Sequence, residues 1–233
     1  MEGEHSGGKV SGRLYIVATP IGNLEDLTFR ALRILNKVSV IACEDTRQTM
    51  KLLNRYSIKK KLLSYYQPRE SQKTPLIIKI LKEGKDVALV TDSGTPGLSD
   101  PGYPLITEAV RQGITLCPVP GASALTAALS ASGLPSHRFL FLGFSPPKKE
   151  ATKKMLQSLK KEKATLVFYM PTRKLLSFLE VCQTILGERQ IVIAREMTKI
   201  HEEFLRGKTE ELIKKLEGKI IKGEATVLIE GKR

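Results

Sequence analysis

The sequence predicts an α/β fold of two domains, the first with a mostly parallel sheet and the second with a mixed sheet. Short apolar runs, which are typical of buried strands, alternate with longer amphipathic segments that favour helices. Such alternation predicts a parallel sheet with helices on both faces. The pattern is interrupted by Ser-Gly-Leu-Pro-Ser at 132–136, a composition typical of a connection between domains.

The first domain, expected over 13–131, contains five apolar runs that end in turn residues and therefore favour strands. These runs are 14–18, 38–42, 62–63, 87–90 and 115–119. Thr28 is a typical N-cap, because apolar residues follow it at helical spacing. Pro75 is expected at the first position of a helix, where its missing N–H costs nothing. Further helices are expected over 104–112, over 124–131 and between the segment 44–47 and about Tyr56.

The second domain, expected over 138–233 after a linker at 132–137, has strands and helices in a less regular order. Its strands are predicted at 139–144, 165–169, 190–195, 203–206 and 225–230. Its helices are predicted at 148–161, 173–186 and 209–216. This order indicates a mixed sheet, with 203–206 as an edge strand.

The composition predicts a globular protein without a membrane segment. No run approaches the roughly 20 apolar residues of a membrane helix. Residues 1–12 are polar and Gly-rich, which predicts a flexible tail and no signal peptide. The three cysteines lie far apart, which argues against a disulfide framework and favours a reducing cytoplasm. The three histidines are also scattered, so we expect no metal site.

The formal net charge of +14 points to an anionic partner, and a polyphosphate backbone is the commonest one. Most of the excess lies after residue 120, where Lys and Arg are frequent and Asp is absent. The plainer interpretation is that Lys-rich helices such as 148–163 are solvated faces. Charge alone does not separate the two.

Four loops follow predicted strands of the first domain, at 19–23, 44–47, 91–102 and 120–123. The carboxyl ends of parallel strands meet at one sheet edge, where open α/β sheets bind ligands. Asp92 can accept hydrogen bonds from ribose hydroxyls or an amine, and the helix start after Gly121 offers N–H groups to an anion. A single loop of this kind is more often a surface turn; four of them predict a ligand crevice.

The motifs in these loops carry a resemblance to a known family. They are Thr-Pro-Ile-Gly-Asn-Leu at 19–24, Glu-Asp-Thr-Arg at 44–47, Asp-Ser-Gly-Thr-Pro at 92–96, Asp-Pro-Gly at 100–102 and Pro-Val-Pro-Gly at 118–121. In this order and spacing they resemble the tetrapyrrole methylase superfamily of S-adenosylmethionine-dependent methyltransferases, and within it the branch that methylates 16S rRNA. The resemblance extends over about 14–230. The chain departs from the family pattern at 66–70 and at 169–174, where a usual glutamate and histidine are missing.

The resemblance implies that S-adenosylmethionine binds in a cleft between the two domains. Much of the contact is expected from backbone groups, and for Met170 and Ala194 ordinary core packing is an equally good interpretation. The cofactor-binding residues it implies are Pro20, Gly22, Asp92, Gly94, Thr95, Gly121, Ser123, Ala124, Met170, Ala194 and Thr226.

The implied reaction is transfer of the cofactor's methyl group to the ribose 2′-hydroxyl of a cytidine in the decoding centre of 16S rRNA. Glu44, Asp45 and Glu196 are candidates for the general base, because all three follow predicted strands. Arg47 and Arg195 could hold phosphates next to the target nucleotide. The alternative for these acids and arginines is ion pairing that fixes loop geometry.

The basic second domain is the predicted RNA-facing surface. Its candidate RNA contacts are Lys148, Lys149, Lys153, Lys154, Arg173 and Arg195. The expected partner is 16S rRNA in the 30S subunit, and the resemblance also implies a homodimer. Two other functions stay open: methylation of corrin or porphyrin rings, and an inactive RNA-binding assembly factor with the same fold. The opening Thr-Pro-Ile-Gly-Asn-Leu motif favours the rRNA branch over the tetrapyrrole branch.

Overall fold

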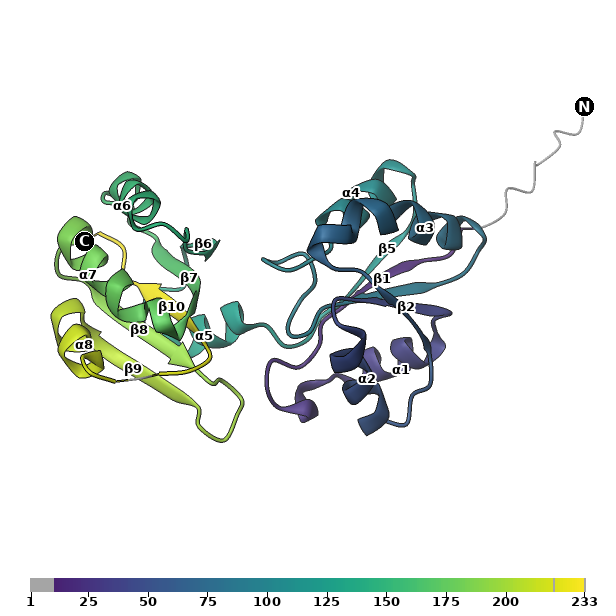
Figure 1. The fold of residues 1–233 in the computed structure, drawn as a ribbon, viewed down its shortest axis with the longest axis horizontal. Helices are drawn as coiled ribbons and strands as arrows, with labels where there is room; N and C mark the ends of the chain where they lie inside the picture. Colours follow the sequence, from purple (N-terminus) through teal and green to yellow (C-terminus); the bar gives the residue numbers. More distant parts are fainter. Residues whose placement is uncertain (1–10, 220, 233) are drawn as a thin grey trace, which may run out of the picture. The chain divides into compact units, whose positions relative to one another are not determined.

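The computed structural model describes residues 11–219 and 221–232, which form two compact units that divide between Ser123 and Ala124 (Figure 1). Most of the predicted tail, 1–12, lies outside the described residues. Each unit has its own five-stranded sheet and its own helices. None of the helices described is both long enough and apolar enough to cross a bilayer.

The sheet of the first unit is entirely parallel, which sharpens the prediction of a mostly parallel sheet. Its strand order is β3-β2-β4-β1-β5. The strands are β1 (Leu14–Val17), β2 (Val40–Cys43), β3 (Lys61–Ser64), β4 (Val87–Val90) and β5 (Leu116–Val119). All five were expected at these places within two residues at each end.

Helices cover both faces of this sheet, as the strand–helix alternation predicts. One core joins α1 and α2 to one face, and a second core joins α3 and α4 to the other (Figure 1). The helices are α1 (Phe29–Lys37), α2 (Thr46–Arg55), α3 (Glu70–Lys82) and α4 (Tyr103–Arg111), with short 3-10 turns η1 (Leu24–Asp26) and η2 (Gln67–Arg69). The prediction for Thr28 is confirmed, because its hydroxyl accepts a hydrogen bond from the Ala31 N–H at 3.1 Å.

The predicted start of the third helix at Pro75 is wrong. α3 begins at Glu70, and Pro75 lies inside it. The proline removes one N–H from the helix ladder. Two anchors earlier in the helix outweigh this loss: Glu70 is buried, and the Thr74 hydroxyl donates to the Glu70 carbonyl at 2.8 Å. Sequence preference for proline at a helix start therefore gives way to tertiary contacts.

The second sheet is mixed, as predicted. Its strand order is β6-β7-β10-β8-β9, in which β6 and β7 run parallel and the remaining pairs are antiparallel. The strands are β6 (Phe139–Phe144), β7 (Thr165–Pro171), β8 (Gln190–Arg195), β9 (Glu203–Lys208) and β10 (Glu224–Ile229). β9 is an edge strand, as expected for 203–206, and β6 forms the opposite edge.

Helices α6 (Lys149–Ser158), α7 (Leu175–Leu186) and α8 (Thr209–Leu216) pack on one face of this sheet through a single apolar core. A 3-10 turn, η3 (Thr172–Lys174), precedes α7. The other face is contacted by α5 (Ala124–Ser132), which meets β8 and β10. The sequence pattern places this helix in the first domain, within 13–131, with the linker at 132–137. The contacts instead group it with the second unit, since α5 buries Leu125, Ala128 and Leu129 and contacts β8 and β10.

Candidate functional site

The strand order of the first unit places two acidic loops next to each other. β2 and β4 are neighbours, yet the chain leaves β2 towards β3 and leaves β4 across β1 towards β5. Such a reversal is the topological switch point at which open α/β sheets bind ligands. The predicted convergence of the four loops at one sheet edge is confirmed, because all five strands are parallel.

The loops after β1 and β4 are fastened by a reciprocal backbone pair. The Thr19 N–H donates to the Gly94 carbonyl at 2.9 Å, and the Gly94 N–H donates to the Thr19 carbonyl at 3.0 Å. The buried Thr19 hydroxyl adds a bond to the Thr91 carbonyl at 3.0 Å. Gly94 has a φ of +80°, a conformation that side chains rarely adopt. The pair therefore requires glycine at this position and fixes both loops.

Three predicted carboxylates meet at the switch point. The Asp45 N–H donates to Asp92 Oδ1 at 3.1 Å, and the Asp92 N–H donates to Glu44 Oε2 at 3.4 Å. Burial raises the pKa of Glu44, and the neighbouring acids raise it further. Burial likewise raises the pKa of Asp92. Both groups thus bind a proton more readily than ordinary carboxylates do.

Asp45 differs from its two neighbours because Arg47 neutralises it. Arg47 Nη2 lies 2.7 Å from Asp45 Oδ2, and Arg47 Nε lies 3.1 Å from Asp45 Oδ1. The hydrogen bonds from the guanidinium and from the Arg47 backbone lower the pKa of Asp45 to about 2. Asp45 also caps α2 through the Arg47 N–H at 2.8 Å. The arginine side chain itself is 86% exposed.

The loop after β5 lies against the loops after β1 and β4. A Cβ at Gly121 would come within 3.1 Å of the Ala18 Cβ, so the backbone passes close to the end of β1. The Thr95 hydroxyl donates to the Ala122 carbonyl at 3.5 Å. The predicted residues Pro20, Gly94, Thr95 and Gly121 therefore belong to loops that contact each other.

A buried acid that no sequence motif singles out holds the loop after β4. Glu70 is only 8% exposed, and its Oε1 accepts a hydrogen bond from the Gly102 N–H at 2.7 Å. The Tyr65 hydroxyl, in a fully buried side chain, lies 3.1 Å from the Thr74 hydroxyl, which bonds to the Glu70 carbonyl. This network joins β3 and α3 to the end of the Gly-rich loop. The segment 66–70 carried no signal beyond its departure from the family pattern.

In the second unit, strand pairing divides the predicted cofactor contacts between two neighbouring rows of residues across the sheet. Thr226 pairs with Ala194 on one side and with Tyr169 on the other, so these three residues form one row. Met170 belongs to the neighbouring row and to the apolar core under the helices. Met170, Ala194 and Thr226 are all buried. Whole-residue burial of this kind fits the packing interpretation weighed for Met170 and Ala194.

The turn after β8 contains Glu196 in a left-handed conformation, with φ +49°, and Thr198 with φ +65°. Glu196 Oε1 lies 3.2 Å from Lys199 Nζ, whereas Arg195 Nη1 lies 2.8 Å from Glu203 Oε2. Arg195 and Glu196 therefore have separate partners. Backbone strain of this kind is concentrated at functional sites, but here the two ion pairs also hold the turn.

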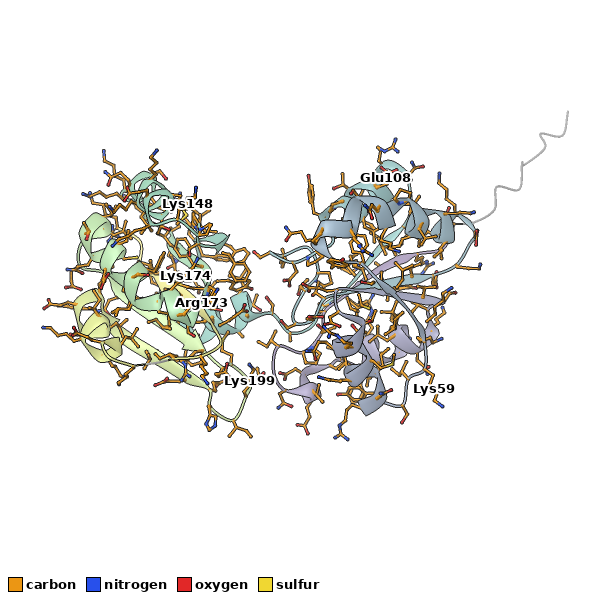
Figure 2. All side chains as sticks on the ribbon, viewed as in Figure 1. Lys59, Glu108, Lys148, Arg173, Lys174 and Lys199 are labelled. Atoms are coloured by element: carbon orange, nitrogen blue, oxygen red, sulfur yellow. The ribbon has the colours of Figure 1, made fainter. Side chains whose placement is uncertain are left out.

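The predicted RNA contacts other than Arg195, which ends β8, lie in α6, at its N-cap, or in η3 before α7. Lys148 is the N-cap residue of α6, and Arg173 lies in η3 (Figure 2). A small cavity of about 110 Å³ is lined by residues that include Lys149 of α6 and Lys174 of η3, so the two starts adjoin. Lys153 is paired with Glu150 at 2.8 Å.

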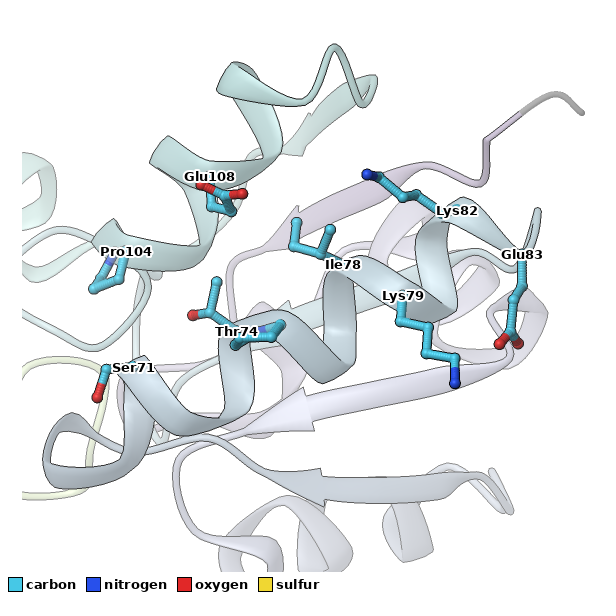
Figure 3. Close-up of a pocket in the computed structure, with 9 residues that line it drawn as sticks. Ser71, Thr74, Ile78, Lys79, Lys82, Glu83, Pro104 and Glu108 are labelled. Atoms are coloured by element: carbon cyan, nitrogen blue, oxygen red, sulfur yellow. The ribbon is translucent and has the colours of Figure 1, made fainter. Parts of the chain in front are cut away.

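Another cavity, of about 620 Å³, lies between α3 and α4 of the first unit (Figure 3). Its lining includes Thr74, Ile78, Lys82, Pro104 and Glu108, and none of the predicted site residues. The carboxylates and the close backbone contacts gather at the loop edge instead. Among the described residues, no group of His, Cys, Asp or Glu is arranged to hold a metal ion.

Comparison with known proteins identifies the family. The model of the Tetrapyrrole (Corrin/Porphyrin) Methylases matches residues 13–213. The chain belongs to this family. It is 51% identical over 221 residues to the ribosomal RNA small subunit methyltransferase I of Thermotoga maritima, which covers 95% of this chain and 99% of that protein. The protein of the same name from Halalkalibacterium halodurans is 48% identical over 220 residues, covering 94% of this chain and 76% of that protein.

Solved structures of tetrapyrrole methylases share the fold. The methyltransferase CobJ superposes with a TM-score of 0.70 at 19% identity, covering 96% of this chain and 97% of that one. Uroporphyrin-III-C-methyltransferase from Thermus thermophilus gives a TM-score of 0.64 at 24% identity, with 94% of each chain covered. The resemblance read from the loop motifs is thereby confirmed, and with it the prediction of a methylase that uses S-adenosylmethionine.

The residues at the loop edge of this methylase suit that cofactor. The carboxylates of Asp92 and Glu44 can accept hydrogen bonds from ribose hydroxyls and an ammonium group. Gly121 provides a stretch of backbone without a side chain at the start of the next segment, where a Cβ would make a tight contact of 3.1 Å with the Ala18 Cβ. Backbone N–H groups in such a loop can bind the cofactor's carboxylate.

We expect Glu70→Ala to release the Gly102 amide, because the substitution removes the acceptor of a buried hydrogen bond. A lost buried bond costs about 1–3 kcal/mol, so exchange of the Gly102 amide hydrogen should accelerate roughly tenfold or more. Hydrogen exchange followed by NMR measures this. Glu70→Gln keeps an acceptor oxygen and should exchange at nearly the wild-type rate. The Gly84 amide, bonded to the Leu81 carbonyl, is the internal control; equal acceleration at both sites would contradict a local anchor.

We also expect Arg47→Ala to raise the pKa of Asp45 from about 2 part of the way to the ordinary Asp value of roughly 3.9. The rise is partial, because the backbone N–H at position 47 still donates to Asp45. Titration of the Asp45 carboxyl carbon by NMR measures the change. Arg111→Ala is the matched control, since Arg111 holds Glu108 in the same two-bond geometry. An unchanged pKa in Arg47→Ala would show that the ion pair does not exist in solution.

Proposed function

We propose that this methylase transfers the methyl group of S-adenosylmethionine to 16S rRNA of the small ribosomal subunit, at the ribose 2′-hydroxyl of a decoding-centre cytidine. The observation that carries the proposal is similarity along almost the whole chain to relatives named ribosomal RNA small subunit methyltransferase I. The net charge of +14 fits an RNA substrate. We further propose that the enzyme acts in the cytoplasm as a homodimer.

In this proposal the loop edge of the first unit holds the cofactor. Asp92 accepts hydrogen bonds from it, while Gly94, Thr95 and the segment around Gly121 contact it through backbone groups. Residues Pro20, Gly22, Ser123 and Ala124 complete the contacts of these loops. Met170, Ala194 and Thr226 are the proposed contacts from the second unit.

When bound, S-adenosylmethionine supplies an activated methyl group, so the protein's task is alignment and proton removal. The attacking ribose oxygen must lose its proton, and a positioned general base contributes about 10²–10⁴-fold. Among the candidate bases Glu44 is best suited, because burial raises its pKa. Asp45 is a poor base, since Arg47 lowers its pKa to about 2. Glu196 is engaged by Lys199 and positions its turn.

The exposed face of the Arg47 guanidinium can then bind the RNA. Two of its nitrogens contact Asp45, and the side chain is 86% exposed. Lys148, Lys149, Lys154 and Arg173 provide the positive surface of the second unit for the phosphate backbone.

Transfer of labelled methyl groups to 30S subunits that lack the modification tests the proposal. We expect incorporation with subunits, and a primer-extension pause at a decoding-centre cytidine at low nucleotide concentration. Naked 16S rRNA and a tetrapyrrole substrate are the comparison arms. Transfer to the tetrapyrrole alone would replace the proposal with a ring methylase, and tight cofactor binding without any transfer would favour an assembly factor.

Glu44→Gln should lower kcat by about 10²–10⁴-fold, because the amide cannot take the proton. Wild-type activity should fall as the pH drops through the raised pKa of Glu44, since only the ionised carboxylate accepts a proton. Asp45→Asn keeps a capping oxygen and should retain most of the activity. Single-turnover rates across a pH series measure both. A larger loss in Asp45→Asn or in Glu196→Gln than in Glu44→Gln would assign the base elsewhere.

A further inference from the structure

β6 carries an exposed aromatic ring at the free edge of the second sheet. Phe144 is the last residue of β6 and is 44% exposed. Its ring centroid lies 5.7 Å from that of Tyr169, and the Phe141 ring lies 4.9 Å from Tyr169, both in edge-to-face geometry. The three rings form a cluster on β6 and β7, and Phe144 is its open end.

An irregularity in the strand turns Phe144 onto this face. Phe141 pairs with Val167, but Phe144 pairs with Tyr169, so β6 contains one residue more than β7 between these pairs. Gly143 takes a φ of +63° at this point, as a bulge requires. In a regular strand of the same sequence, Phe144 would pair with Met170 and lie on the opposite face from Tyr169. The bulge thus exposes the apolar ring of Phe144 at a defined position, which points to a binding role for this residue.

The ring beneath Phe144 is held in place. The Tyr169 hydroxyl accepts a hydrogen bond from the Leu125 N–H at 3.1 Å, in the first turn of α5. Tyr169 also continues the row that contains Thr226 and Ala194, two residues proposed to serve the cofactor. Phe144 therefore stands at the edge end of the row that approaches the proposed reaction site.

Positive charge adjoins the aromatic cluster. β6 and β7 are parallel, so the segments that follow Phe144 and Pro171 leave the sheet at the same edge. Lys148 and Lys149 follow β6, and Arg173 and Lys174 follow β7. Figure 2 labels Lys148, Arg173 and Lys174. An exposed ring beside cations is the combination with which proteins bind single-stranded RNA, by stacking a base and pairing with its phosphates.

We propose that Phe144 is the platform on which an unpaired nucleobase of the RNA substrate stacks, with Tyr169 fixing the ring and the adjoining lysines and arginines holding the phosphates. This inference rests on the proposed rRNA substrate, and it adds a residue that recognises the RNA and does not take part in the methyl transfer. The charge beside the cluster favours RNA over a second copy of this basic chain as the occupant.

Filter binding of 30S subunits at fixed salt tests the platform. We expect Phe144→Ala and Phe144→Leu each to weaken binding about tenfold or more, because both remove the π-face. Phe144→Trp should restore affinity to near the wild-type value. Phe139→Ala is the matched control, since Phe139 lies on the same strand and is 43% exposed. Binding of S-adenosylmethionine by calorimetry should be unchanged in all four variants, which also shows that they fold.

Two results of the binding experiment would overturn the inference: wild-type affinity in Phe144→Leu, or equal losses of affinity in Phe139→Ala and Phe144→Ala. A third is a change in the molar mass of the Phe144 variants, measured by light scattering, without a change in their affinity for 30S subunits. The last would make Phe144 part of an interface between copies. Failure of the proposed function is distinguishable, because wild-type protein would then neither bind nor methylate 30S subunits.

Discussion

The pair of backbone hydrogen bonds between Thr19 and Gly94 is the contact on which the site of the first unit depends. It joins the loops after two neighbouring strands, and each further contact is made from one of these loops. Asp92, just before Gly94, receives the Asp45 amide, while Thr95, just after it, reaches the Ala122 carbonyl. The arrangement of the four loops therefore depends on a glycine at position 94 with a φ of +80°.

Carboxyl groups that lie near each other on this edge have pKa values shifted in opposite directions, which the geometry explains. Glu44 and Asp92 are partly buried among acids, whereas Asp45 faces a guanidinium. One type of functional group thereby serves two purposes: a buried acid that can exchange a proton, and a charged acid that caps α2 and orients Arg47. The difference in pKa between these carboxyl groups arises from burial and from pairing with a guanidinium.

The sequence predicts the elements well where local rules act alone, as with the Thr28 cap, the apolar strands and the loop motifs at their ends. It fails where distant residues decide. Pro75 lies inside α3 because Glu70 and Thr74 are anchored by contacts that no local rule contains. Glu70 is an acid whose partner, Gly102, lies far along the chain. The cofactor positions Met170 and Thr226 were expected from resemblance, but their burial is set by strand pairing, which the sequence leaves open.

The bulge at Gly143 couples the length of β6 to its backbone conformation. Edge strands and their loops usually tolerate the loss or gain of a residue, because few partners register the shift. Here the deletion of one of the two residues between Phe141 and Phe144 would remove the bulge, and Phe144 would still lie opposite Tyr169 on the same face. Straightening the strand without a deletion would instead place Phe144 opposite Met170, on the other face. A chain that presents this ring is therefore expected to keep the extra residue and the positive φ at position 143 together, or to lose both.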